Sequence, residues 1–167
     1  MRFQGNVYRA LNPLFARKPF SGRGAALYGG RFNPRGVSSL YTSLTILTAI
    51  RESNQAGSLQ PTTIVCYEAD FHNIFDTRDE DALAQLNMNA GLLADPTWRD
   101  RMLNDGKAPT QVFSETLVEK GYDGLLVRSF ARGASEFDLN LVLWRWSLSA
   151  PHRLTLIDDE GRLKQGG

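Results

Sequence analysis

The chain has 167 residues, a length that fits one domain of ordinary size. Hydrophobic residues make up 42% of it and charged residues 22%, so the chain can bury a core and is not disordered as a whole. Nineteen Lys and Arg against eighteen Asp and Glu leave a formal net charge of +1. This balance argues against a protein whose main affinity is for nucleic-acid phosphate.

The basic residues are mostly arginines, because Lys supplies only four of the nineteen and Arg supplies the rest. Arg is preferred where a planar, two-pronged group recognises phosphate or carboxylate.

The strands expected from β-branched and apolar runs cover residues 6–11, 37–42, 62–71, 124–129, 139–146 and 153–157. Alternation along the fifth of these puts Trp144 and Trp146 on one side of the strand, toward a core. Residues 12–36 contain many Gly and Pro and are expected to form loops and short extended pieces.

The helices expected from the same pattern cover residues 44–54, 82–86 after an acidic start at 76–81, 96–103 and 109–120. Thr42 or Ser43 is the expected cap of the first helix, and Gly121 occupies the expected position after the last. Strands and helices are mixed without a regular βαβ alternation, which predicts an α+β fold.

The single cysteine and the lack of targeting or membrane-spanning segments indicate the cellular compartment in which we expect the protein. Cys66 cannot form an intramolecular disulfide and lies in an apolar run, so we expect an inert buried thiol. His72 and His152 have no metal-ligand spacing with Cys66, so no metal site is expected. The first ten residues lack the apolar core of a signal peptide, and no segment approaches the about 20 apolar residues that span a bilayer. We therefore expect a soluble, cytoplasmic protein without membrane contact.

Two places have residues suited to chemistry. Gly29 and Gly30 followed by Arg31 could let the backbone approach a ligand while the guanidinium holds a phosphate, or could form a purely structural turn. Glu52 shares a helix face with Thr45, Thr48 and Ala49. This small, polar face could line a cleft, or Glu52 could be a solvated residue near a helix end.

The motifs in their order along the chain resemble the RES domain. They are Tyr8-Arg9, then Gly29-Gly30-Arg31-Phe32-Asn33-Pro34-x-Gly36, then Tyr41-Thr42-Ser43, then Glu52, and later the looser Gly124-x-x-x-x-Ser129 and Asn140-Leu141-Val142-Leu143. The resemblance covers residues 6–146, and residues 70–108 contribute no motif to it. It implies a single RES-like domain over 1–167, with a split β-sheet core and flanking helices similar to ADP-ribosyltransferases.

The resemblance also implies a function. RES proteins are the toxin half of bacterial toxin–antitoxin pairs and consume NAD⁺ as a substrate. Some release ADP-ribose or its phosphate, and others transfer ADP-ribose to a protein acceptor. Their partner is an antitoxin with a helix-turn-helix (Xre-like) region. Here that partner would be a separate chain that binds the DNA, in keeping with the near-neutral charge of this one.

The motif residues suit that chemistry. Cleaving the nicotinamide–ribose bond produces a ribosyl cation, which the Glu52 carboxylate would stabilise. Tyr41 would stack on the nicotinamide ring, and Arg9 and Arg31, beside Gly30, would hold the pyrophosphate. Ser129 would hydrogen-bond the ribose or position Glu52. We therefore expect Glu52, Arg31 and Tyr41 to act in catalysis, and Arg9, Gly30, Arg31, Tyr41 and Ser129 to bind NAD⁺.

Two other functions remain open from sequence. A ribonuclease-like toxin is disfavoured by the near-neutral charge and by the lack of a His–Glu or His–His pair. A non-catalytic binding module would use the glycine loop and the arginines for a ligand alone. Among transferases, Arg-specific ones carry a second Glu two residues before the catalytic one, where this chain has Ile50. That difference disfavours Arg as the acceptor side chain.

Overall fold

A computed structural model describes residues 1–54 and 57–163. In this part of the chain seven strands form one sheet: β1 (Phe3–Leu11), β2 (Leu40–Ser43), β3 (Thr63–Phe71), β4 (Ile74–Asp76), β5 (Gly124–Arg128), β6 (Leu139–Leu143) and β7 (His152–Leu156). Their order across the sheet is β4-β5-β6-β2-β1-β3-β7. β4 and β5 are parallel, and the other neighbours are antiparallel.

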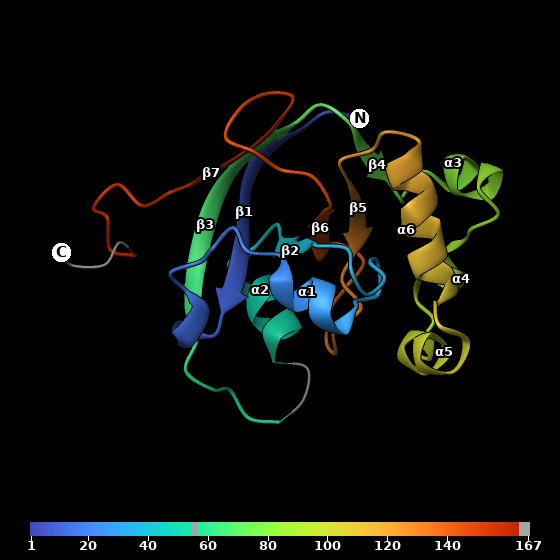
Figure 1. The fold of residues 1–167 in the computed structure, drawn as a ribbon, viewed down its shortest axis with the longest axis horizontal. Helices are drawn as coiled ribbons and strands as arrows, with labels where there is room; N and C mark the ends of the chain where they lie inside the picture. Colours follow the sequence, from blue (N-terminus) through green and yellow to red (C-terminus); the bar gives the residue numbers. More distant parts are fainter. Residues whose placement is uncertain (55–56, 164–167) are drawn as a thin grey trace.

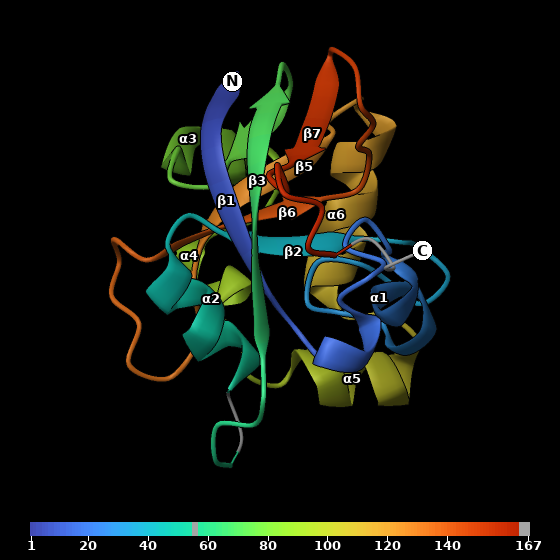
Figure 2. The ribbon, with the colours of Figure 1, turned by 90° about the vertical axis from the view of Figure 1, so that its left-hand side faces the viewer.

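The sheet divides between β1 and β2. These two strands pair only at Tyr8 and Ser43, whereas β1 pairs with β3 along its whole length from Phe3 to Leu11. One half of the sheet therefore contains β1, β3 and β7, and the other contains β2, β4, β5 and β6 (Figure 2). Together with the flanking helices, this curled, mixed sheet confirms the expected α+β fold.

The helices are α1 (Arg23–Tyr28), α2 (Ile46–Ser53), α3 (Glu80–Gln85), α4 (Ala90–Leu93), α5 (Trp98–Asp105) and α6 (Pro109–Glu119), with a 3₁₀ turn at Pro13–Phe15. Figure 1 shows α3 to α6 gathered at the β4–β5 end of the molecule, with α1 and α2 nearer its middle. Within the described residues, no helix has the length and hydropathy that a membrane span requires.

Alternation along the strands sends apolar side chains into two separate cores. On β5, Leu126 packs in the first core, and its neighbours Leu125 and Val127 pack in the second. On β6, Leu141 and Leu143 face the first core and Val142 the second, as the period of two in a strand requires. The second core fills the space between the β4–β5–β6 side of the sheet and helices α3, α4 and α6.

Several element boundaries differ from those expected. The helix after β2 begins at Ile46, and its cap is Thr45 rather than Thr42 or Ser43, because Ser43 is still paired with Asn140 in the sheet. β2 itself begins at Leu40, since the Val37 carbonyl accepts a hydrogen bond from the Asn33 side chain in the preceding turn. The short elements β4 and α4 were not expected.

Two segments expected to be irregular or extended are not. Residues 23–28 form α1 within the Gly-rich and Pro-rich segment, because only one glycine falls between its flanking Gly22 and Gly29. β6 ends at Leu143, where the Trp144 N–H turns to the Asp123 carbonyl.

Three side chains lie differently from expectation. Trp144 packs against the second core and Trp146 against the first, so they do not share one side of a strand. Cys66 is only partly buried, between Val65 and Tyr67, which are fully buried. This partial burial raises the pKa of its thiol, in keeping with an unreactive cysteine.

We predict that Leu117→Ala lowers the free energy of unfolding by about 2–5 kcal/mol, because it opens a cavity in the second core. Leu117 on α6 is 0% exposed. The matched control is Val118→Ala at the next position, where the side chain is 37% exposed and little apolar contact is lost. Urea unfolding followed by circular dichroism measures both. Equal effects of the two substitutions would contradict the assignment of α6 to the core.

Candidate functional site

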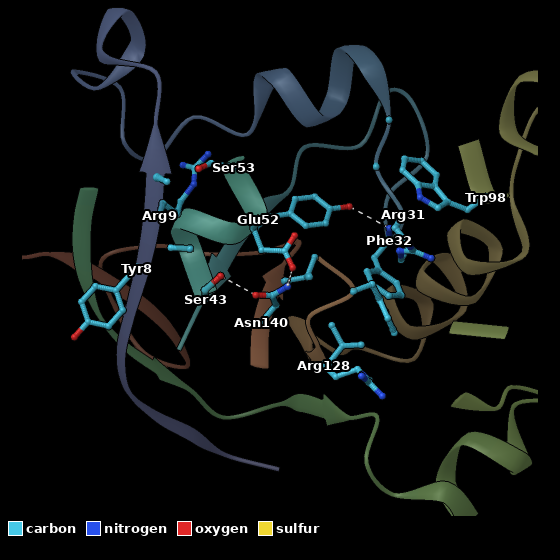
Figure 3. Close-up of a pocket in the computed structure, with 18 of the residues that line it drawn as sticks. Tyr8, Arg9, Arg31, Phe32, Ser43, Glu52, Ser53, Trp98, Arg128 and Asn140 are labelled. Atoms are coloured by element: carbon cyan, nitrogen blue, oxygen red, sulfur yellow. Dashed lines mark hydrogen bonds between the residues drawn. The ribbon is translucent and has the colours of Figure 1, made fainter. Parts of the chain in front are cut away.

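A cleft of about 380 Å³ lies where β1 and β2 separate. Its walls come from β1, β2, α2, β5, β6, the segment 29–32 after α1 and the first turn of α5 (Figure 3). Its size is within the range of small-molecule sites, which usually combine apolar walls with a few polar groups. Four of its lining residues are arginines, and Glu52 is its one lining carboxylate among the described residues. The cleft is therefore a positively charged pocket with a single acid in it.

Glu52 reaches the cleft from the last turn of α2. Thr48 and Ala49, one turn earlier, are buried, so the predicted face of this helix does pack inward. Arg51 points elsewhere and forms an ion pair with Asp138 at 3.3 Å. Of the two alternatives that the helical spacing left open for Glu52, a cleft-lining residue or a solvated one, its position in the middle of the labelled side chains in Figure 3 agrees with the first.

The Glu52 carboxylate is held by donors from two other segments. The Ser129 hydroxyl, just after β5, donates to Oε1. The Asn140 Nδ2 on β6 donates to the same oxygen at 2.7 Å. Asn140 is held in turn, because the Ser43 hydroxyl on β2 donates to its Oδ1 at 2.7 Å. Ser43 and Asn140 face each other directly in the β2–β6 register, so this contact follows from the strand pairing.

Arg31 lies across the cleft from Arg9. Its Nη1 donates to the carbonyls of Leu93 at 3.1 Å and Asp95 at 2.7 Å. Partial burial lowers the pKa of Arg31, while the nearby carboxylates of Glu52 and Asp95 act to raise it. The guanidinium keeps its charge at neutral pH, because the pKa of arginine lies so far above that range.

Tyr41 fixes the segment that carries Arg31. Its hydroxyl donates to Asn33 Oδ1 at 2.5 Å and accepts the Phe32 N–H at 3.1 Å. Burial raises the pKa of this phenol, against the weaker opposing effects of the Phe32 N–H and Arg31. Tyr41 is therefore neutral and able to donate, and its ring lines the cleft.

Gly30 is required here by close packing. A Cβ at this position would lie 2.5 Å from Asn33 Oδ1 and would also collide with the Tyr41 hydroxyl. The N–H of Gly30 donates to the Asn33 carbonyl at 2.9 Å, and the N–H of Gly29 donates to Ala25. Both amides are engaged within the protein, so these two N–H groups are not presented to a ligand.

Arg9 stands on β1 at the opposite side of Glu52 from Arg31 (Figure 3). Its Nη1 donates to the carbonyl of Pro19 at 2.9 Å, and the buried Tyr67 hydroxyl donates to the same carbonyl. The guanidinium is thus tied to the segment 12–22 on one side while it lines the cleft.

A family model for the RES domain matches residues 6–164, nearly the whole chain. The chain belongs to the RES-domain family. RES domains are found in toxin–antitoxin systems, so membership implies an antitoxin partner. No curated protein sequence matches the chain significantly.

Most of the residues expected to form the site of this RES domain come together. Arg9, Gly30, Arg31, Tyr41 and Glu52 all line the cleft. Ser129 is 1% exposed and does not line the cleft, but its buried hydroxyl donates a hydrogen bond to the Glu52 carboxylate. Among residues 1–54 and 57–163, no group of three or more His, Cys, Asp or Glu is arranged to hold a metal ion.

Several residues of the cleft were not predicted from the sequence. Asn140 and Ser43 lay within motif runs, but neither was expected to take part in the site. Trp98 and Arg99 come from residues 70–108, which contributed no motif to the resemblance, yet both line the cleft. The same region supplies the Leu93 and Asp95 carbonyls that hold Arg31. Spacing along the chain carries no signal for contacts this far apart.

Tyr41→Phe is expected to lower the free energy of unfolding by about 1–3 kcal/mol, because Asn33 Oδ1 and the Phe32 N–H lose their partner in a buried place. Tyr28→Phe is the control, since Tyr28 is exposed. Chemical denaturation at neutral pH measures both. A Tyr41→Phe protein as stable as the control would show that the hydroxyl does not hold the Arg31 segment.

Proposed function

We propose that this RES domain is the toxin of a toxin–antitoxin pair and that it cleaves the nicotinamide–ribose bond of NAD⁺. The observation that carries the proposal is the Glu52 carboxylate, fixed by Ser129 and Asn140 in a cleft whose other charged lining residues, among those described, are arginines. A fixed acid among cationic groups suits a ligand that carries both a positive ring and a negatively charged diphosphate. NAD⁺ is such a ligand.

Glu52 would act on the charge that develops in the reaction. The bond between ribose C1′ and the nicotinamide nitrogen breaks, and its electron pair leaves with the ring. Nicotinamide departs neutral, so no acid has to protonate it, and the ribosyl group is left with oxocarbenium character. A preorganised carboxylate stabilises that cation without reorganising at the moment of reaction. The acceptor then forms a bond to C1′ and loses its proton.

The remaining residues would bind and orient the dinucleotide. Arg9 and Arg31 line the cleft on either side of Glu52 and would hold the diphosphate through charge-assisted hydrogen bonds. Tyr41, with its hydroxyl engaged by Asn33 and Phe32, would offer its ring for stacking on nicotinamide. Gly30 would contribute surface rather than an N–H donor, and Ser129 would position Glu52 rather than touch the ribose.

The acceptor of ADP-ribose would be a protein side chain, water or phosphate, and the partner a helix-turn-helix (Xre-like) antitoxin. Incubation of the antitoxin-free protein with labelled NAD⁺ and a cell lysate separates the acceptors. A labelled protein band indicates a transferase, and small labelled products alone indicate a glycohydrolase or a phosphorylase. In both cases the chain itself would bind no nucleic acid.

We expect Glu52→Gln to reduce the release of nicotinamide from NAD⁺ at least about 100-fold, because the neutral amide no longer stabilises the ribosyl cation. Glu119→Gln is the matched control, since Glu119 is exposed at the end of α6 and does not line the cleft. Chromatographic detection of free nicotinamide measures both. If the unsubstituted protein releases none, the NAD⁺-cleaving proposal is wrong and a binding module is the better interpretation. If Glu52→Gln releases as much as the control, Glu52 is not the catalytic carboxylate.

Asn140→Ala tests whether the amide positions Glu52. We expect kcat to fall by about tenfold or more while KM stays within about twofold, since the carboxylate loses one of the donors that fix its position. The control is Asn6→Ala, at an exposed position on β1 outside the cleft. A purely structural role would instead lower the unfolding midpoint and leave the kcat of the folded fraction unchanged.

A further inference from the structure

Arg31 is held in the cleft by backbone carbonyls rather than by a carboxylate. Its Nη1 donates to the Leu93 carbonyl at 3.1 Å and to the Asp95 carbonyl at 2.7 Å. Both contacts use the same nitrogen, so the N–H groups of Nε and Nη2 remain for other partners. The carbonyls are neutral, and Arg31 forms no ion pair with any described residue. They therefore orient the guanidinium while its charge stays available to a ligand.

The backbone at Asp95 is fixed in turn by the Asp95 side chain. Its Oδ1 accepts hydrogen bonds from the Thr97 N–H at 2.8 Å and from the Thr97 hydroxyl at 2.6 Å. An Asp side chain that accepts from the N–H two residues later closes an Asx turn, and Pro96 has the restricted φ that favours a turn here. The other oxygen, Oδ2, accepts from Arg101 Nη1 at 3.3 Å, one turn into α5. The carboxylate thus joins the start of α5 to the backbone that holds Arg31.

The same turn leads directly to an aromatic neighbour of Arg31. Thr97 is the N-cap residue of α5, and Trp98 is its first residue. The Trp98 ring lines the cleft, with its centroid 5.8 Å from the guanidinium carbon of Arg31 (Figure 3). The Phe130 ring centroid lies 4.7 Å from the same carbon. Asp95 itself is not among the described residues that line the cleft, so its carboxylate acts on Arg31 from outside the cleft.

We propose that Asp95 is a positioning residue for Arg31. The proposal rests on the proposed function, in which Arg31 holds the diphosphate of NAD⁺. The Asx turn keeps the Asp95 carbonyl within reach of Nη1, and this carbonyl keeps the guanidinium in one orientation before the diphosphate binds. A cation that is already ordered loses less conformational entropy on binding, so the turn contributes to affinity. The chemical step at Glu52 does not depend on it.

The test compares three substitutions that each remove one negative charge. Asp95→Ala removes the acceptor of the Asx turn, Asp95→Asn keeps an oxygen in its place, and Asp100→Ala is the control. Asp100 is exposed on α5 and is not among the described residues that line the cleft. Calorimetric titration with ADP-ribose measures the affinity for the diphosphate without turnover, and circular dichroism checks that each variant folds.

We expect Asp95→Ala to bind ADP-ribose about tenfold more weakly than the unsubstituted protein, whereas Asp95→Asn and Asp100→Ala stay within about twofold. In the nicotinamide-release assay, Asp95→Ala raises the KM for NAD⁺ about tenfold and leaves kcat within about twofold, because only binding is weakened. A merely structural role would lower the unfolding midpoint and leave the KM of the folded fraction unchanged. The proposal is overturned if Asp95→Ala binds ADP-ribose as tightly as Asp100→Ala, or if Asp95→Asn binds it as weakly as Asp95→Ala.

Thr97→Val is a second variant, which keeps the Asp95 carboxylate and removes only the hydroxyl that donates to it. We expect it to bind ADP-ribose about threefold more weakly than the unsubstituted protein. If Asp95→Ala does not fold, an unchanged affinity of Thr97→Val overturns the proposal.

The two proposals fail separately. If nicotinamide is released and Asp95→Ala behaves as the control does, the positioning role is wrong and the NAD⁺-cleaving function stands. If ADP-ribose binding depends on Asp95 in a protein that releases no nicotinamide, Asp95 positions Arg31 for a diphosphate ligand that is not cleaved. If the unsubstituted protein releases nicotinamide but binds ADP-ribose too weakly to measure, the KM for NAD⁺ decides in place of the titration. A protein that neither binds ADP-ribose nor releases nicotinamide overturns both proposals.

Discussion

The pairing of Ser43 with Asn140 across β2 and β6 sets the position of the Glu52 carboxylate in the cleft. Asn140 uses both ends of its amide, accepting from Ser43 and donating to Glu52. A shift of β6 by one residue would send Asn140 to the opposite face of the sheet and put an apolar side chain beside Glu52. The register between these strands is fixed by apolar neighbours on both faces, namely Leu141 and Leu143 in the first core and Val142 in the second. The chemistry proposed for the cleft therefore depends on how the cores pack.

The sequence predicted the parts of the site that are local. The face containing Thr48, Ala49 and Glu52 followed from helical spacing, and the Arg31 and Tyr41 positions followed from the RES resemblance. The role of Asn140 was not predicted, because its partner Ser43 lies 97 residues away in the sequence. The periodicity within one strand does not indicate which strand will lie beside it. The helix cap was misplaced for the same reason. Ser43 has the right side chain for a cap, but the sheet had already engaged it, so Thr45 takes that position.

The glycines illustrate a different limit. The sequence left two alternatives open for the pair Gly29-Gly30, a close approach of the backbone to a ligand or a purely structural turn. In the structure Gly30 leaves room for the Tyr41 hydroxyl and Asn33, and its N–H is used inside the turn, which agrees with the second alternative. The sequence alone did not show that the space beside Gly30 is occupied by other side chains of the same protein.

The arrangement of the arginines also becomes clear only in the structure. Seven arginines are ion-paired with carboxylates, whereas the four that line the cleft have no such partner among the described residues.

The segment between β5 and β6 contacts both the Glu52 carboxylate and the Arg31 guanidinium of the cleft. It begins with Ser129, which donates to Glu52, and Phe130, on which Arg31 stacks. It ends with Asp138, which accepts from Thr48 and pairs with Arg51 on α2. The Glu52 carboxylate and the Arg31 guanidinium thus both contact one short segment, 129–138, which is itself bound to α2, the helix that carries Glu52. A molecule that displaced this stretch from outside would disturb the carboxylate and the guanidinium together, without entering the cleft.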